Sequence, residues 1–324
     1  AYLLYGRYLQ NKWGIDPNAK TPAYEMEDGV DYVPADTNVV FGHQFASIAG
    51  AGPINGPIQA AIFGWLPVLL WILIGGVFFG AVQDFASMYA SVKNKGRTIG
   101  YIIEEYIGKL GKKLFLLFCW LFCILVVAAF ADVVAGTFKG FTVDEAGAVT
   151  KIAANGAVAT TSMLFIIEAV ALGYFLKYTK FNKWINTAVA ILLLVAAIAL
   201  GLNFPVYVDL GTWHIIIFVY ILIASVAPVW ALLQPRDYLN SYLLIFMIVG
   251  AVIGVFVANP ACNLKPFTSF NVNGQYMFPI LFVTIACGAV SGFHSLVSSG
   301  TASKQIKNEK NMLPVSFGAM LMES

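Results

Sequence analysis

Long stretches of the chain contain only uncharged side chains, and they dominate its pattern of polar and apolar positions. The longest of them have no Asp, Glu, Lys or Arg, and they cover residues 184–208, 210–235, 238–264 and 266–303. A helix needs about 20 mainly apolar residues to cross the hydrocarbon core of a bilayer, and each run is long enough. The pattern therefore predicts an all-α membrane protein, a multi-span helical bundle.

We expect one transmembrane domain over residues 1–324, with spans separated by clusters of charge. A partial helix at residues 1–8 precedes the spans and another begins at 315–324, so we expect the domain to be incomplete at both ends. Residues 98–110 show helical amphipathic spacing, which favours a short helix on the inner membrane surface over a solvated connector. The predicted spans lie near residues 39–62, 65–92, 114–138, 157–176, 184–203, 212–234, 238–258 and 276–299.

Composition supports this class and excludes others. Hydrophobic residues make up 59% of the chain and charged residues 11%, whereas an ordinary soluble domain is about 25% charged. The net charge of +2 provides no basic surface, so we expect no nucleic-acid partner. The 4 Cys form no CxxC pair, and no nucleophile-and-base set occurs at a recognisable spacing. We therefore expect no enzyme activity, no bound metal and no cofactor apart from a coupling ion.

The positive charges are unevenly divided between alternate connections of the predicted spans. Of the 19 Lys and Arg residues, 16 fall on one side of this topology and 3 on the other. Cytoplasmic loops retain positive charge, so the first side is assigned to the cytoplasm.

The first predicted span contains three Gly and two Pro within residues 48–57. This density is too high for one continuous helix, so we expect an interruption near the middle of the membrane. Such an interruption is tolerated only inside protein or beside a watery cavity, which makes it a candidate site. We expect Pro57 in the first turn of an outer half-helix, with free N–H groups at Gly56 to Ile58 that suit a carboxylate. The substrate-binding candidates here are Gly50, Ala51, Gly52, Asn55 and Gly56.

The sixth predicted span carries a second interruption at residues 227–235. Two prolines would free backbone carbonyls there, and free carbonyls can bind a cation or an amide. The two interrupted spans are five positions apart in the order of spans, so they run in opposite directions. Paired broken helices of opposite direction are typical of inverted-repeat transporters, although simple proline kinks are the alternative. The candidates added here are Pro228, Trp230 and Gln234.

Ionisable groups at membrane depth are candidates for ion coupling. Asp84 precedes Lys93 on the second span, and we place its carboxylate about 13 Å from the inner boundary. A carboxylate there must be protonated, paired or exposed to a cavity. The eighth span has a polar face that could bind Na⁺ or carry a proton, unless its hydroxyls bond their own helix backbone. The ion-coupling candidates are Asp84, Glu168, Ser291, His294 and Ser295.

Several specific sequence strings are distributed along most of the chain. They are residues 31–34, 42–57, 80–85, 228–230 with 235–238, 284–294 and 318–324. Together they resemble the carbon starvation protein A family of bacterial transporters. The resemblance implies a multi-pass protein of the cell inner membrane that imports peptides when carbon is scarce, and some relatives carry pyruvate instead. The family is similar in architecture to the LeuT-like amino acid, polyamine and organocation transporters. These have a five-plus-five inverted repeat with broken first and sixth core helices.

We therefore expect a secondary active importer of peptides, coupled to a proton in preference to Na⁺. A symporter of pyruvate or another small carboxylate is the alternative within the family. An ion channel or passive pore is the alternative of another class, and it would need a continuous wetted path. The sequence leaves the substrate, the coupling ion and the oligomeric state open.

Overall fold

The computed structural model describes residues 1–324 except 51, 144–147, 180–182 and 228–231. The chain forms two compact units: Ala1–Lys112 with Leu243–Ser324, called the first unit, and Lys113–Tyr242, called the second unit. Within the described residues, 5 helices are long and apolar enough to cross a membrane. They are Trp65–Lys93, Lys109–Phe138, Ala153–Phe175, Ile185–Asn203 and Pro235–Ala258. The prediction of an all-α membrane protein is confirmed.

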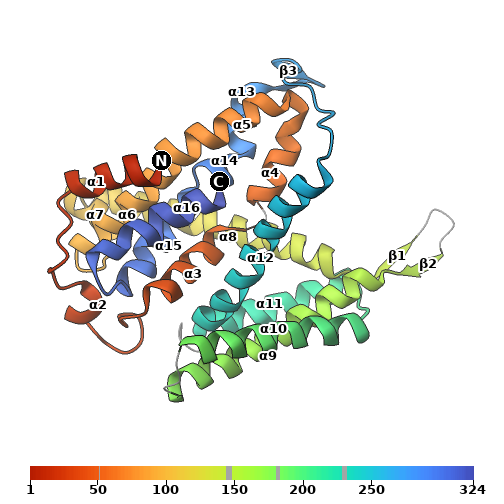
Figure 1. Ribbon diagram of the computed structural model, residues 1–324, viewed down its shortest axis with the longest axis horizontal. Helices are drawn as coiled ribbons and strands as arrows, with labels where there is room; N and C mark the ends of the chain where they lie inside the picture. The colour runs from red at the N-terminus through yellow and green to blue at the C-terminus, as the bar shows by residue number, and fades with distance from the viewer. Residues whose placement is uncertain (51, 144–147, 180–182, 228–231) are drawn as a thin grey trace. The chain divides into compact units, whose positions relative to one another are not determined.

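The second unit consists mainly of long apolar helices (Figure 1). They are α8 (Lys109–Phe138), α9 (Ala153–Tyr178), α10 (Lys183–Asn203) and α11 (Leu210–Val226), and the hairpin of β1 (Phe141–Val143) and β2 (Val149–Lys151) connects α8 to α9. Helices α9 and α10 pack against each other through small buried side chains that include Ala169 and Ala190. Helices α8, α9 and α10 cover the predicted spans 114–138, 157–176 and 184–203.

Helix α11 begins after an aspartate that caps its N-terminus. The carboxylate of Asp209 accepts hydrogen bonds from the Thr212 hydroxyl at 2.6 Å and the Thr212 backbone N–H at 3.0 Å. These bonds favour the charged form, so they hold the pKa of Asp209 below its ordinary value. A lowered pKa contributes stability above the unfolded-state pKa, and this contribution is lost as the pH falls through the folded-state pKa.

We therefore expect acidification to fray the first turn of α11. In hydrogen–deuterium exchange, protection of the Thr212 amide should fall as Asp209 becomes protonated, after correction for the intrinsic exchange rate. Asp209→Asn keeps an oxygen that can cap the helix but cannot titrate in this range. Protection in this variant should therefore not change with pH, and wild-type protection that is equally insensitive to pH would contradict the assignment.

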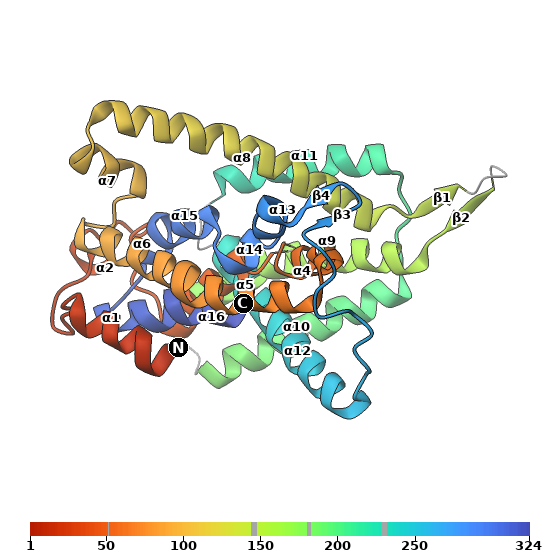
Figure 2. The same cartoon turned by 90° about the horizontal axis from the view of Figure 1, so that it is seen from above.

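The first unit contains two groups of shorter helices from the two ends of the chain (Figure 2). The N-terminal group comprises η1 (Tyr2–Gly6), α1 (Arg7–Lys12), α2 (Pro22–Glu25), α3 (Thr37–Ile48), α4 (Gly52–Ala60), η2 (Ala61–Phe63), α5 (Trp65–Ile74), η3 (Gly75–Gly80), α6 (Ala81–Lys93) and α7 (Ile99–Tyr106). The C-terminal group comprises β3 (Asn271–Val272), β4 (Gln275–Tyr276), α13 (Met277–Thr284), α14 (Ala286–Ala289), α15 (Gly292–Gly300), η4 (Ala302–Lys304), η5 (Glu309–Asn311), η6 (Leu313–Gly318) and α16 (Ala319–Glu323). Helix α12 (Leu233–Ala258) has residues in both units.

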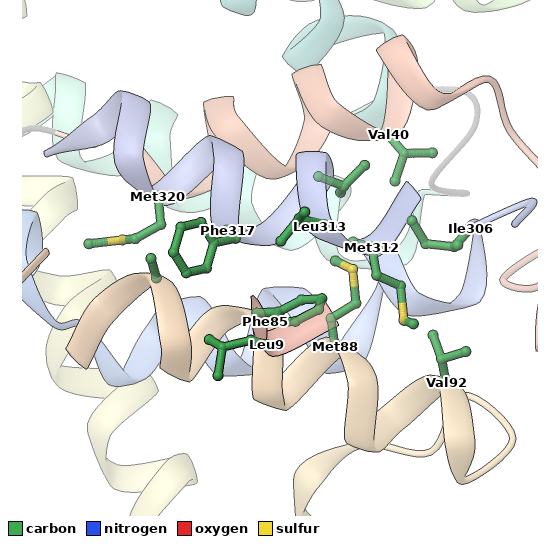
Figure 3. Close-up of a cluster of buried hydrophobic side chains, with 13 residues drawn as sticks. Leu9, Val40, Phe85, Met88, Val92, Ile306, Met312, Leu313, Phe317 and Met320 are labelled. Carbon is green, nitrogen blue, oxygen red and sulfur yellow. The ribbon is translucent and has the colours of Figure 1, made fainter. Parts of the chain in front are cut away.

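The main apolar core of the first unit lies between α6 and the C-terminal helices η6 and α16 (Figure 3). The rings of Phe85 and Phe317 meet edge to face at 6.5 Å, and Trp13 stacks on Phe85 at 4.8 Å. The labelled members of this core are Leu9, Val40, Phe85, Met88, Val92, Ile306, Met312, Leu313, Phe317 and Met320. This packing fixes α6, which carries Asp84, against α16.

The first predicted span, residues 39–62, is interrupted in the structure. Helix α3 ends at Ile48 and α4 begins at Gly52, while Ala51 lies outside the described residues. The outer segment does not begin near Pro57 as expected, because Pro57 lies inside α4. Proline removes one backbone hydrogen bond from a helix interior, yet α4 continues to Ala60 with one face against α13 and α14.

The eighth predicted span, residues 276–299, was expected to be one helix, and the structure divides it into α13, α14 and α15. The break between α14 and α15 is formed by Val290 and Ser291, which have extended backbone angles (φ −160°, ψ 98° and φ −108°, ψ 126°). A tertiary contact supports the break, since the side-chain amide of Gln83 donates a hydrogen bond to the Ser291 carbonyl at 2.7 Å. The Ser291 carbonyl therefore accepts two hydrogen bonds, one from α6 and one from the backbone N–H of His294 in the first turn of α15 at 3.2 Å.

The predicted sixth and seventh spans, 212–234 and 238–258, have different bounds in the structure. Helix α11 ends at Val226 and α12 begins at Leu233, so Gln234 belongs to the seventh helix. Pro235 lies in the first turn of α12, where a proline costs little because that N–H has no partner within the helix. Pro228 and Trp230, the other candidates of the second predicted interruption, lie outside the described residues.

Three shorter predictions also differ at their ends. The surface helix expected at 98–110 is α7, which ends at Tyr106 because Gly108 adopts φ 106° before α8 begins. The N-terminal helix continues beyond residue 8 to Lys12, and the C-terminal helix begins at Leu313 instead of residue 315.

Candidate functional site

Two interrupted helices of the first unit meet at their breaks. Helix α4, which follows the first break, packs against α13 and α14, which precede the second (Figure 2). The backbones are so close that a Cβ on Gly56 would lie 2.5 Å from the Thr284 carbonyl oxygen. A Cβ on Gly52 would lie 2.6 Å from the Cβ and Sγ atoms of Cys287. Glycine is therefore required at both positions for this contact.

The free backbone donors of the first break lie earlier than the sequence suggested. The first turn of a helix has N–H groups without partners in the helix. In α4 these belong to Gly52 and Ile54, since Pro53 has no N–H. Of the expected donors, those of Gly56 and Ile58 lie beyond this turn, and Pro57 between them has no N–H. Gly50 is exposed at the break, so an anionic group could be bound by α4 from that side.

A cavity of ≈ 430 Å³ lies beside α4 in the first unit. Its polar groups are neutral amides and a hydroxyl, with no charged side chain. Thr284, whose carbonyl contacts Gly56, is one of its residues. The lining consists of Gln59, Ala60, Ile62, Phe63, Val272, Asn273, Gln275, Ile280 and Thr284.

A buried ionisable cluster lies next to the second break. His294 of α15 is between two carboxylates: its Nδ1 atom is 3.3 Å from Oδ2 of Asp84, and its Nε2 atom is 3.4 Å from Oε2 of Glu323. The side chains of Asp84 and Glu323 are 0% exposed and that of His294 is 1% exposed. The structure thus brings together two sequence candidates, Asp84 and His294, with a third group that the sequence reasoning did not name.

Each member of this cluster is positioned by a different element. Asp84 comes from α6, whose preceding residue Gln83 holds the Ser291 carbonyl one turn before His294. Glu323 comes from the end of α16, and the neighbouring Ser324 hydroxyl donates a hydrogen bond to the Gly288 carbonyl of α14 at 2.9 Å. The extended residues between α14 and α15 therefore direct α15 toward the two carboxylates.

The side chains of the cluster can carry two negative charges but only one positive charge. Both oxygens of Asp84 and of Glu323 are buried and have no hydrogen-bond partner among the described residues, and the same is true of Nε2 of His294. A buried ionised carboxylate without compensation is costly. Even a protonated imidazole would balance only one of the two carboxylates. The site therefore requires one further positive charge, which either a proton or a metal cation could supply.

One group of residues also offers a set of metal-binding atoms. Within the described residues, Cys287, His294 and Glu323 form the group of His, Cys and acidic side chains whose ligand atoms all lie within 4.8 Å of one another. Cys287 lies in α14, the short helix before the break, and its thiol forms no disulfide bond.

Several serines of the polar face predicted on the eighth span make structural hydrogen bonds. The hydroxyls of Ser295 and Ser299 donate to carbonyls of their own helix, as the alternative interpretation expected. Ser298 accepts a hydrogen bond from the side-chain amide of Gln44 at 2.8 Å, which joins α15 to α3. Ser291 contributes through its carbonyl. Glu168 belongs to α9 of the second unit, where its Oε2 atom is buried without a hydrogen-bond partner among the described residues.

Sequence reasoning missed Glu323 and Cys287. Glu323 was available as an isolated acidic residue in the apolar segment 312–323, the same signal that singled out Asp84. Cys287 had only the spacing of seven residues to His294, which brings side chains to one face of a continuous helix. The break between them makes that spacing a poor guide, so no sequence signal identified the pair.

Comparison with known proteins provides the family. The family described as carbon starvation protein CstA matches residues 1–324. The chain is 39% identical to "Peptide transporter CstA" of Escherichia coli (strain K12), over 100% of this chain and 46% of that protein. It is 38% identical to "Peptide transporter CstA" of Bacillus subtilis (strain 168), over 100% of this chain and 54% of the relative.

A relative with a different printed function also matches. The chain is 37% identical to "Pyruvate/proton symporter BtsT" of Escherichia coli (strain K12), over 100% of this chain and 45% of that protein. The chain thus spans about half the length of these curated relatives. No solved structure matches it.

Proposed function

The chain belongs to the carbon starvation protein CstA family, and from this premise we propose that it functions in secondary active import of peptides across the bacterial inner membrane. Relatives named peptide transporters that align with the whole chain support peptides as the cargo. The uneven distribution of Lys and Arg supports an orientation with the positively charged connections in the cytoplasm.

One observation carries the proposal: a buried cluster with unbalanced negative charge lies beside two helix breaks that face each other. In transporters with broken helices, substrate and coupling ions bind where the helices are interrupted. We place the substrate carboxylate near the N–H groups of Gly52 and Ile54, and the coupling cation between Asp84, His294 and Glu323. A proton is the first choice of cation, because one relative is named a proton symporter.

We also propose a LeuT-like inverted repeat. Its two interrupted helices are not the first and sixth predicted spans, as the sequence suggested, but the first and eighth. The two breaks in contact are those of the first and eighth predicted spans, at α3–α4 and α14–α15. In the predicted topology these spans are seven positions apart, so they run in opposite directions, as the inverted repeat requires. Alternating access would then come from movement of one group of helices against the other.

Import of pyruvate or another small carboxylate is the second candidate function. It is favoured by the relative named a pyruvate/proton symporter, and by backbone donors at the start of α4 that fit a carboxylate of any cargo. The neutral amide groups that line the neighbouring cavity support peptides, since amides match the donors and acceptors of a peptide backbone.

Uptake into proteoliposomes tests the proposal. Labelled dipeptides, tripeptides, amino acids and pyruvate are supplied one at a time under a proton gradient or a sodium gradient. We expect peptides to accumulate above their external concentration under the proton gradient, and to equilibrate when an ionophore collapses it. Accumulation of pyruvate alone would establish the alternative cargo. Flux that never exceeds equilibrium under either gradient would indicate a passive pore and overturn active import.

A further inference from the structure

Buried His294 lies close to the half-buried Cys287 and to Glu323, so that three different metal-binding atoms come together. Their sulfur, nitrogen and oxygen atoms all lie within 4.8 Å of one another. Metal–ligand bonds of about 2.0–2.3 Å place neighbouring ligands of a tetrahedral ion about 3.5 Å apart. The Nε2 atom of His294 and the Oε2 atom of Glu323 are already at 3.4 Å.

We propose that Cys287, His294 and Glu323 bind a divalent transition-metal ion of the Zn²⁺ class, with Asp84 orienting the imidazole. A metal-binding histidine ordinarily donates its other ring N–H to a carboxylate, which fixes the tautomer and the ring orientation. Oδ2 of Asp84 lies 3.3 Å from Nδ1 of His294 as an ion-pair contact, on the opposite side of the ring from Glu323. The Met320 sulfur is the present hydrogen-bond partner of Nδ1, so Asp84 would take over this N–H when the ion binds. This arrangement leaves Nε2 free to bind the ion.

Burial argues for an ion at this point instead of three independent side chains. Nε2 of His294 and both oxygens of Glu323 have no hydrogen-bond partner among the described residues, although their side chains are 1% and 0% exposed. Buried polar atoms are ordinarily paired, so each unpaired atom needs an explanation. A divalent ion would pair Nε2 and one Glu323 oxygen at once, and it would offset two of the three negative charges of Asp84, Glu323 and the Cys287 thiolate.

The donor set also selects the kind of ion. Hard cations such as Na⁺, Mg²⁺ and Ca²⁺ prefer shells of oxygen atoms, whereas thiolate and imidazole favour Zn²⁺ and related transition metals. Three protein ligands leave a fourth tetrahedral position open. Met320 is adjacent, with its sulfur 3.2 Å from Nδ1 of His294, so the surroundings are soft as well as buried.

One consequence for transport rests on the proposed function. The ion would bind His294 and Glu323, two of the three groups that we assign to the coupling cation, so Zn²⁺ should reduce gradient-driven uptake. The binding experiment below does not measure transport. Its failure would leave the import proposal intact, and failure of the uptake assay would leave the metal site intact.

Cobalt binding to the detergent-solubilised full-length protein tests the site. Cys119, Cys123 and Cys262 are first replaced by Ser, so that Cys287 is the remaining thiol of residues 1–324. Titration with Co²⁺ alone should give one bound ion per chain, with d–d bands of a tetrahedral ion and a near-ultraviolet sulfur-to-cobalt charge-transfer band. Zn²⁺ should then displace the Co²⁺ and remove both signals.

Variants decide whether the assigned residues hold the ion. Cys287→Ser should abolish the charge-transfer band, and Asp84→Asn should keep it but weaken Co²⁺ binding about 10- to 100-fold. Glu323→Gln should weaken binding with the thiol still present, which preserves the test if Cys287→Ser fails to fold. The matched control is Glu104→Gln on α7, which should bind Co²⁺ normally. Absence of the charge-transfer band with Cys287 intact, or unchanged affinity in Glu323→Gln, would overturn the proposal.

Discussion

Replacement of Asp84 by Asn should abolish accumulation of substrate against its gradient. Asp84 is fully buried in α6 and supplies one of the two carboxylates beside His294. Asn has nearly the same shape but no negative charge, so the cluster would no longer need a further cation. Substrate and cation binding should then be uncoupled, and the proton gradient could no longer drive net uptake.

The measurement compares uphill accumulation with exchange at equal concentrations on the two sides. Asp84→Asn should reduce accumulation to the level of empty liposomes, while exchange of labelled for unlabelled substrate continues because the substrate site remains. Asp132→Asn is the matched control, since Asp132 lies on α8 with its side chain 75% exposed and contacts His214. It should accumulate substrate like the wild type. Full proton-driven accumulation by Asp84→Asn would exclude Asp84 from coupling.

The membrane class and most long helices could be predicted from the sequence, because they depend on local physics. An uncharged run of about 20 residues has few alternatives to a membrane helix, whatever its neighbours are. Helix α8, for example, covers the predicted span 114–138 and extends it at the start to Lys109. Deeply placed Asp84 was found for the same reason, since an isolated carboxylate in an apolar segment needs a special environment.

The positions of the breaks were harder, because tertiary contacts decide them. The dense Gly and Pro of residues 48–57 indicated an interruption, but the start of α4 at Gly52 depends on packing against α13 and α14. The break at Val290 and Ser291 has no proline, and it is supported by the side-chain amide of Gln83, more than 200 residues earlier. The partnership of Glu323 with His294 is likewise a contact between separate helices, which helical spacing cannot reveal.

Replacement of Gly56 by Ala should lower both the stability of the protein and its transport activity. The new Cβ would lie 2.5 Å from the Thr284 carbonyl oxygen and 3.3 Å from the Ile285 Cα. These are backbone atoms, so no side-chain rotation relieves the clash, and α4 must move away from α13. Overpacking of this kind costs about 1–3 kcal/mol. The movement would also separate Gly52 from Cys287 and disturb the contact between the two breaks.

Gly250→Ala is the control that separates this clash from the general effect of alanine in a helix. Gly250 lies inside α12 with nothing within 4 Å of its added Cβ, so alanine there should be neutral or stabilise by up to about 1 kcal/mol. Thermal unfolding in detergent should therefore show a lower midpoint for Gly56→Ala and an equal or higher one for Gly250→Ala. Proteoliposome uptake should be lost in the first variant and retained in the second. If Gly56→Ala transports normally at an unchanged midpoint, the close contact between α4 and α13 is not needed to form the site.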